Sequence, residues 1–368
     1  MSNWLTYSPT SGHGNGTITI TADTISSLEN RVATIIASNS QYGVSDSVLI
    51  TQYKASPTLL TPLTFNILSA GTINWTATDT AVTKTIEYKV NDGEWASITS
   101  NTGSSAPTIT VKASDKIQFR GNNEQYATED HSKYNSFSGC TASFELEGNI
   151  MSLIYGDDFK NNSTISSGYT FEGLFRGCAK LVSAENLVLP ATTLTDYCYR
   201  GMFWGCTSLT VAPALPATTL GSECYNSMFQ GCTSLTTAPA LPATTLKSEC
   251  YAGMFQGCIS LTQAPALPAT ALPWGCYSGM FVGCHSLTTA PELPATTLTE
   301  RCYDEMFRNC TSLNYIKCLA TDISTTYGCT NNWVWGVASN GTFVKASSMK
   351  SWKRGDDGIP TRWAIRNE

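Results

Sequence analysis

A 26-residue repeat in the C-terminal half is the feature that most constrains this chain. Its full copies share the pattern Cys-Tyr-x-x-Met-Phe-x-x-Cys and start at Cys198, Cys224, Cys250 and Cys276. A fifth copy starts at Cys302 and decays, and an atypical earlier copy contains Cys178. One such repeat cannot bury its apolar residues alone, so we expect the copies to stack into one continuous core, closed by atypical copies at the ends.

Each copy predicts one coil with two segments. The Leu-Thr-x-Ala-Pro-x-Leu-Pro stretch is short and extended, because its prolines stop it from continuing as a helix. The Cys-Tyr-x-x-Met-Phe-x-x-Cys stretch has apolar residues at i, i+1, i+4, i+5 and i+8, which we interpret as one or two buried helical turns. Equivalent residues are expected to stack along the axis, namely Leu209, Leu235, Leu261 and Leu287, and Phe203, Phe229, Phe255 and Phe281.

The Phe-x-x-Cys-x-x-Leu signature with its following Leu-Pro strand resembles the bacterial surface-type leucine-rich repeats, from about Phe171 to Leu319. Met-Phe stands where that family often has Ala-Phe, and Ala-Pro replaces the usual strand aliphatic, so no particular ligand carries over. The resemblance implies a solenoid with a strand-lined concave face and an adhesive role. We assign residues 151–319 to this solenoid and residues 320–368 to a C-terminal cap. Tryptophans are expected in the core of that cap rather than as ligand platforms, namely Trp333, Trp335, Trp352 and Trp363.

The first 150 residues differ from the repeats. In residues 1–55 the runs TITITAD, RVATIIAS and SVLITQYKA alternate as strands do, and turn-forming clusters divide them. This predicts a small immunoglobulin-like β-sandwich. The segment resembles BACON domains, modules of gut-associated Bacteroidetes proteins and their phages, for which a carbohydrate- or mucin-binding role has been suggested. The resemblance rests on Trp4, Ser8-Pro9, Ser11-Gly12, Thr17–Ile20, Arg31 and Thr51-Gln52.

A second, somewhat larger immunoglobulin-like β-sandwich is expected over residues 59–150. Its runs include KTIEYKV and EWASI, which Asn91-Asp92-Gly93 joins as a hairpin. Residues 122–137 break the alternation and are expected to form a surface loop. The fold class is therefore mostly β, with two sandwiches followed by a short capped leucine-rich-repeat solenoid.

Of the 14 cysteines, twelve lie between Cys178 and Cys318, most of them in two columns. We interpret them as buried packing residues, since a free cysteine behaves as a small apolar side chain. Disulfides are the alternative, and they would need an oxidising compartment. A metal site is the least favoured interpretation, because a regular ladder without histidine partners is not a tetrahedral cage.

Composition and motifs exclude several classes of function. Net charge is −6 and no Lys/Arg run exceeds two residues, so nucleic-acid binding is not expected. No apolar run approaches the ~20 residues of a membrane span, and no signal peptide is visible. No nucleophile motif, phosphate-binding loop or metal-spaced cluster occurs, so we expect no enzyme, no metal and no cofactor. Of the histidines, His13 and His131 are expected to be solvated loop residues.

Function must then come from a surface, and on stacked repeats the columns that vary between copies are the exposed ones. They predict a binding surface made of Trp204, Val211, Gln230, Thr237, Gln256, Gln263, His285, Thr289, Glu292 and Arg308. Most of these are small or neutral, which favours sugar or flat protein contacts, and a plain solvated face is the alternative. Six strands at ~4.8 Å spacing span only ~25–30 Å. The strand face therefore offers roughly a few hundred Å2, which is less than the ~800 Å2 per partner that a stable interface needs. We therefore expect several copies to act together as a homo-oligomer.

Two hypotheses follow. The chain is a virion protein, such as a head or tail fibre or decoration protein resembling fibres of crAss-like phages, which infect Bacteroidetes. It would attach to capsid or tail proteins by one end and present the other to a host-surface protein, glycan or mucin. Alternatively, it is a bacterial cell-surface adhesin built from the same modules. The missing secretion signal and the reduced cysteines favour the virion, and a purely structural spacer is the third possibility.

Overall fold

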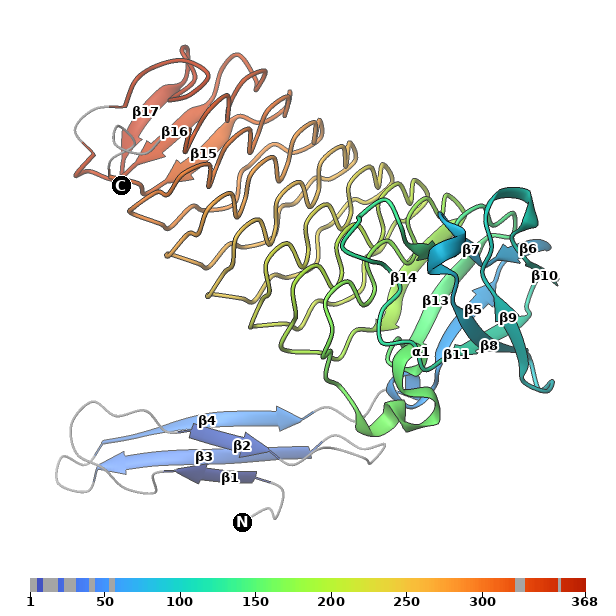
Figure 1. Cartoon of the computed structure of the whole chain (residues 1–368). Coiled ribbons are helices and arrows are strands. Elements are labelled where there is room, and N and C mark those ends of the chain that lie inside the picture. The colour runs from blue at the N-terminus through green and yellow to red at the C-terminus, as the bar shows by residue number, and fades with distance from the viewer. Residues whose placement is uncertain are drawn as a thin grey trace. The chain divides into compact units, whose positions relative to one another are not determined.

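The computed structural model describes residues 5–8, 19–22, 31–39, 44–52, 57–321, 328–349 and 352–368. The fold is mostly β and divides into two compact units, Met1–Leu60 and Thr61–Glu368 (Figure 1). In the described residues the only α-helix is α1 (Ser152–Tyr155). The short 3-10 helices are Pro57–Leu60, Thr80–Val82, Gly103–Ser105 and Gly156–Asn161. The described residues are thus mostly strands and turns, in agreement with the predicted mostly β fold class.

The first unit contains two antiparallel strand pairs. Strand β1 (Leu5–Ser8) pairs with β2 (Thr19–Ala22), and β3 (Arg31–Asn39) pairs with β4 (Val44–Gln52) along their whole length. Strands β2, β3 and β4 coincide with the three alternating runs of the sequence. His13, predicted as a solvated loop residue, lies outside the described residues.

The second unit begins with a six-stranded sheet in the order β14-β13-β5-β11-β8-β9. The predicted hairpin is confirmed, because β8 and β9 pair antiparallel around Asn91, whose φ of 52° is tolerated by asparagine in a turn. Two smaller sheets pair β6 with β10 and β7 with β12. The strand bounds are β5 (Leu63–Ile67), β6 (Gly71–Asn74), β7 (Thr76–Ala77), β8 (Thr85–Val90), β9 (Ala96–Thr99), β10 (Thr108–Val111), β11 (Lys116–Arg120), β12 (Asn135–Ser136), β13 (Phe144–Asn149) and β14 (Leu181–Val188).

Strand β13 joins this sheet to the repeats. It pairs antiparallel with β5 and parallel with β14, which belongs to the atypical first copy. Phe65 of β5 lies 6.1 Å from Phe175 of the first coil, ring centre to ring centre. One apolar core therefore runs from Leu63 through the coils to Trp363, and the six-stranded sheet closes the first end of the coil stack.

The prediction of a surface loop over residues 122–137 is wrong in part. The segment is irregular, but Tyr126 and Phe137 are fully buried. The Tyr126 ring stacks at 6.2 Å on Phe171, and the Phe137 ring stacks at 5.7 Å on Phe175. The loop therefore supplies the first rings of the two ladders described below, and its polar composition hid these two packing residues.

The repeats form coils that stack one on the next, visible as successive windings in Figure 1. In each turn segment, residues 197–205 and their equivalents, alternate backbone N–H groups donate to the neighbouring coil. Tyr199 donates to the Cys224 carbonyl at 3.0 Å, and Phe203 donates to that of Met228 at 2.9 Å. The N–H groups between them close turns within the coil, as Met202 does on Tyr199 at 3.2 Å. Half of the backbone donors of a turn segment are thus satisfied only when a neighbouring coil is present.

The predicted helical turns are therefore wrong. The segment is a run of β-turns in which every fourth residue adopts a left-handed conformation, as Tyr197, Gly201 and Gly205 do with φ of 61°, 56° and 75°. The apolar pattern i, i+1, i+4, i+5, i+8 repeats every 4 residues, a period that fits these turns better than the 3.6 residues of a helix. The glycine spacing carries the same information, because glycine adopts left-handed φ without a steric penalty.

Two aromatic ladders fill the interior of the stack. Tyrosine rings stack at 5.8–6.2 Å along one ladder, and phenylalanine rings stack at 5.4–5.7 Å along the other. Trp333 ends both, at 6.2 Å from Tyr303 and from Phe307. The predicted stacking of Phe203, Phe229, Phe255 and Phe281 is confirmed, and the equivalent leucines are fully buried.

Prolines explain why the central coils have no long strands. Proline lacks the N–H that a ladder needs, and the Ala-Pro stretches show only isolated parallel bridges, such as Thr237 with Gln263. Where Ala-Pro is absent, full strands form: β14 at one end, and β15 (Tyr315–Cys318), β16 (Thr342–Lys345) and β17 (Ala364–Asn367) at the other. Near this second end Trp333 and Trp363 are buried and Trp352 is partly buried, as predicted, whereas Trp335 is exposed.

All fourteen cysteines are buried free thiols, which confirms that they pack in the interior. In the column of the second cysteine, each thiol donates a hydrogen bond to the carbonyl of a phenylalanine in an adjacent coil. The distances are 3.0–3.2 Å from Cys206, Cys232, Cys258, Cys284 and Cys310. Burial raises the pKa of the Cys258 thiol to about 12. Reduced sulfur is thus part of the packing, since only the S–H form can donate.

Thiol labelling tests this arrangement. The thiolate is the reactive form, so raised pKa values and burial should leave the native chain almost unlabelled by a disulfide reagent near pH 8. In guanidinium chloride the same reagent should count fourteen thiols per chain. Fewer than fourteen in the unfolded chain, or rapid labelling of the native chain, would contradict the buried-thiol arrangement.

Candidate functional site

The turn segments carry a column of side chains held in a costly backbone conformation. We call it the outer column: Tyr169, Tyr197, Glu223, Glu249, Gly275, Arg301 and Gly328, with φ between 51° and 63°. Five of the seven are not glycine, although a left-handed conformation costs an ordinary residue about 1–2 kcal/mol. Strain of this kind at successive equivalent positions favours a functional use of the side chains.

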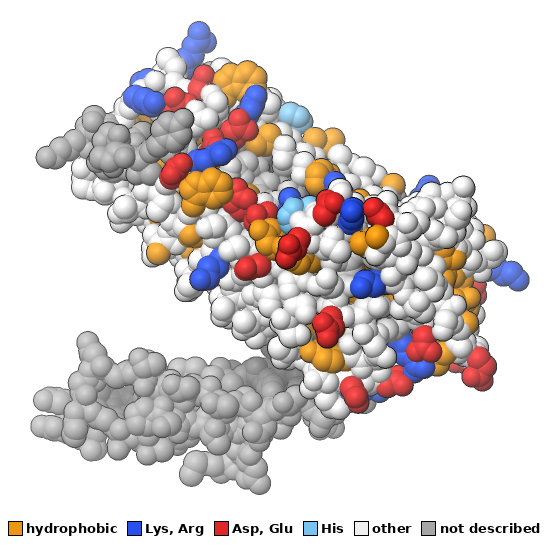
Figure 2. All heavy atoms as spheres, in the orientation of Figure 1, with side chains coloured by type: hydrophobic (Ala, Val, Ile, Leu, Met, Phe, Trp, Pro, Cys, Tyr) orange, Lys and Arg blue, Asp and Glu red, His pale blue; other side chains and the backbone are white. Residues whose placement is uncertain are grey.

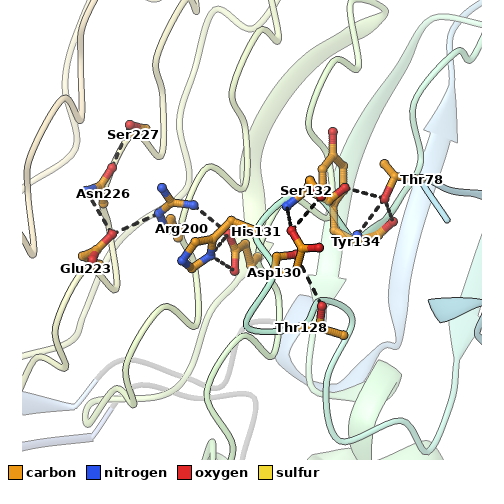
Figure 3. Close-up of polar contacts among 11 residues, drawn as sticks. Thr78, Thr128, Asp130, His131, Ser132, Tyr134, Arg200, Glu223, Asn226 and Ser227 are labelled. Carbon is orange, nitrogen blue, oxygen red and sulfur yellow. Dashed lines mark hydrogen bonds and ion pairs between the residues drawn. The ribbon is translucent and has the colours of Figure 1, made fainter. Parts of the chain in front are cut away.

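At the first end of the outer column, a buried carboxylate connects the 122–137 loop to the coils, and Figure 3 labels its partners His131 and Arg200. Glu172 is nearly inaccessible, and it accepts hydrogen bonds from Arg200 at 2.9 Å and lies 3.0 Å from Nδ1 of His131. Arg200 also donates to Glu223 at 3.2 Å. Burial raises the pKa of Glu172, while the Arg200 and His131 contacts oppose that rise. His131 is therefore a paired loop residue whose side chain is 36% exposed, and the prediction that it is solvated is wrong in part.

Two tyrosines stack beside this cluster. The rings of Tyr169 and Tyr197 are 4.8 Å apart and nearly parallel, and His131 lies 5.0 Å from Tyr197. Burial and nearby acidic residues raise the pKa of both phenols, so they remain neutral donors at physiological pH. The first end of the column thus presents aromatic rings in an acidic setting.

Acidic and basic side chains alternate along the rest of the turn segments. Arg301 pairs with Asp304 at 2.8 Å, and Arg308 pairs with Glu305 at 2.6 Å. Arginines also lie over exposed or half-buried tryptophans, with Arg176 at 3.8 Å from Trp204 and Arg308 at 5.1 Å from Trp335. Figure 2 shows acidic and basic side chains side by side on one face of the coil stack. We call the outward-facing side chains of the turn segments the turn face.

The predicted binding residues fall into two groups in the structure. The turn face holds Trp204, Gln230, Gln256 and Arg308, all half-buried. The extended segments hold Val211, Thr237, Gln263 and Thr289, all exposed and all in parallel bridges. His285 is exposed, and Glu292 pairs with Lys317 at 3.0 Å. The structure therefore places only the first group with the outer column.

The outer column itself was missed by the sequence prediction. The signal was present, because the three positions before the first cysteine read TDY, GSE, KSE, PWG and TER in successive copies. The position two residues after that cysteine varies as well, with Arg200, Asn226, Ala252, Ser278 and Asp304. The predicted binding residues came from other columns of the repeat, and the left-handed backbone that makes the outer column informative appears only in the structure.

Comparisons with known proteins identify the N-terminal module alone. The BACON family model, described as "Putative binding domain, N-terminal", matches residues 2–53, which confirms the predicted resemblance of that segment. No curated protein and no solved structure matches the chain. The described residues contain neither a helix able to cross a bilayer nor a group of three side chains placed to hold a metal ion.

Removing Arg200 tests the buried cluster. Arg200→Ala should lower the free energy of unfolding by roughly 2–3 kcal/mol, because it leaves a buried carboxylate short of its cation. Arg308→Ala is the matched control, since its pair with Glu305 is far more exposed and should cost no more than about 1 kcal/mol. Urea unfolding of both variants measures the difference, and equal losses would contradict the special role of Glu172.

Replacing an outer-column side chain tests the strain. Glu249→Gly should raise the free energy of unfolding by roughly 0.5–1 kcal/mol, because it relieves a left-handed residue at some cost in unfolded-chain entropy. Glu300→Gly, in the adjacent exposed column without positive φ, should not stabilise the chain. If Glu249→Gly instead lowers the free energy of unfolding, the Glu249 side chain stabilises the fold, and its place in the outer column is explained by folding.

Proposed function

We propose that this chain is a non-enzymatic attachment protein that binds glycans or glycan-bearing surfaces through its turn face. The observation that carries the proposal is the outer column, whose side chains persist at left-handed positions where glycine would be more stable. Their chemistry supports sugar contact, because aromatic rings, carboxylates and guanidinium groups lie together and most charges are paired. The BACON match at residues 2–53 adds a second binding module by the description of its family.

We further propose that the coils are a leucine-rich-repeat solenoid of the bacterial surface type. Support comes from the 26-residue coil, the one fully buried leucine per copy after the second cysteine, and the parallel bridges between extended segments. The residues before Leu181 and after Cys318 would then be its two caps. In this proposal the turn face, and not only the strand side, contacts the ligand.

A virion is the setting that we favour, with the chain as a head or tail fibre or a decoration protein. Five buried thiols act as hydrogen-bond donors in the stacked coils, so the fold is best assembled where cysteines stay reduced. A virion protein folds in the host cytoplasm and meets that condition. A bacterial cell-surface adhesin with the same modules is the alternative.

Mass spectrometry tests the setting. DNase-resistant particles and washed cell envelopes from the source culture would be searched for peptides of this chain. Many copies in the particles are expected for a virion protein. Recovery from the envelopes alone would overturn the virion proposal and leave the adhesin.

A binding assay tests the function separately. The full chain, presented as a multivalent conjugate because single contacts are expected to be weak, should bind immobilised mucin above an albumin surface. Periodate treatment of the mucin, which destroys vicinal diols, should remove the binding. Equal binding to mucin and albumin would overturn the proposal that the chain attaches to glycans.

A further inference from the structure

Trp274 breaks the pattern of its column on the turn face. The equivalent residues are Ser222 and Ser248 in the two preceding coils and Glu300 in the next. Its side chain is 40% exposed, whereas most large aromatic side chains of the coils are buried. Packing therefore does not explain a tryptophan at this position, and an exposed indole is a ready surface for a ligand.

The glycine that follows Trp274 leaves room for a carboxylate beside the Trp274 backbone. Gly275 has a φ of 60°, and a Cβ placed there would lie 3.1 Å from Cγ and 3.6 Å from Oε1 of Glu249. The Glu249 side chain thus extends across Gly275, next to Trp274 in the chain. The two backbones are also joined, since the Glu249 N–H donates to the Trp274 carbonyl at 3.1 Å. A side chain at position 275 would press on Cγ of Glu249, so glycine suits this arrangement.

Glu249 has no partner of its own. Among the residues that the structure describes, none donates a hydrogen bond to its carboxylate or forms an ion pair with it. Burial, and then the nearby Glu223, raise its pKa. A half-buried carboxylate without donors is costly, so an external donor would be favourable here.

Arg301 approaches from the next coil. Its guanidinium lies 5.6 Å from the centre of the Trp274 ring, and two of its nitrogens contact Asp304, which leaves other N–H donors for a ligand.

We propose that Trp274, Glu249 and Arg301 form a subsite for one neutral pyranose unit of a glycan. The indole would stack on the C–H face of the sugar, the Glu249 carboxylate would accept hydrogen bonds from its hydroxyls, and Arg301 would donate to a further oxygen. The subsite rests on the proposed glycan-binding function and assigns it to one place on the turn face.

The charges of the subsite favour a neutral ligand. Asp304 pairs with Arg301, while Glu249 is attracted by Arg301 and Arg200 only at a distance, so an anionic sugar would meet one carboxylate more than the Arg301 charge offsets. A quaternary ammonium would fit the carboxylate, but Arg301 already lies over the indole and would repel it. Hydroxyl groups satisfy the carboxylate without adding charge to the site.

The test uses the full chain and simple probes. Methyl glycosides of galactose, glucose and mannose would be compared with methyl glucuronide and choline, using saturation-transfer NMR and tryptophan fluorescence. Trp274→Ser is the main variant, because sister coils carry serine there and should fold alike. Trp335→Ser is its matched control, since Trp335 is 44% exposed and also lies beside an arginine, but Glu305 there is already paired.

At least one neutral glycoside should bind the wild-type chain. Binding should fall at least tenfold in Trp274→Ser and severalfold in Glu249→Gln, and it should be unchanged in Trp335→Ser. Unchanged binding in Trp274→Ser, an equal loss in Trp335→Ser, preferred binding of the glucuronide or choline, or no binding of any neutral probe would overturn the subsite. If mucin binding persists in those cases, the subsite alone fails; if the wild-type chain does not bind mucin, the proposed function fails with it.

Discussion

The hydrogen bonds between coils are the interaction on which the rest of the structure depends. Every second N–H of a turn segment donates to the next coil, and the others close turns within their own coil. This alternation requires a left-handed residue at every fourth position, which sets the glycine spacing and the period-4 apolar pattern. The same alternation brings equivalent side chains into register, so the aromatic and cysteine ladders follow from it. A coil without a neighbour would lose the carbonyl acceptors of half its turn-segment N–H groups, and it would also lose its buried core.

This dependence makes the two ends a problem that the fold has to solve. At one end, β13 pairs with β14 while Tyr126 and Phe137 supply the first rings of the ladders. At the other, Trp333 ends both ladders, and three parallel strands replace the isolated bridges. Each end thus continues the backbone pairing and the ring stacking of the coils with unrelated sequence. The β-rich segment before the repeats is, in this respect, part of the repeat structure.

The sequence predicts whatever repeats with the coil and fails where the information lies in backbone conformation or in distant contacts. The stacking of Phe203 with Phe229 and the burial of the cysteines follow from periodicity alone. The turn segment was predicted to be helical because a short apolar pattern with a period of 4 residues resembles one with a period of 3.6 residues. Only the glycine spacing distinguishes the two patterns. Tyr126 and His131 could not be placed from the sequence, because their partners Phe171 and Glu172 lie over 40 residues away in an irregular segment.

The candidate site, too, could be predicted only in part from the sequence. Variation between copies points to exposed or half-buried positions, but it cannot rank them, because a position varies either when its side chain is unconstrained or when different side chains are useful there. Backbone strain separates the two cases. Thr237 and Gln263 vary on an unstrained extended segment, where most residues are tolerated, so their variation needs no explanation. The outer column, which includes Glu223 and Glu249, varies at a conformation that penalises most residues other than glycine and asparagine. A side chain that persists there against a stability cost is better evidence of use than one that is merely exposed, which is why we propose the turn face as the binding site.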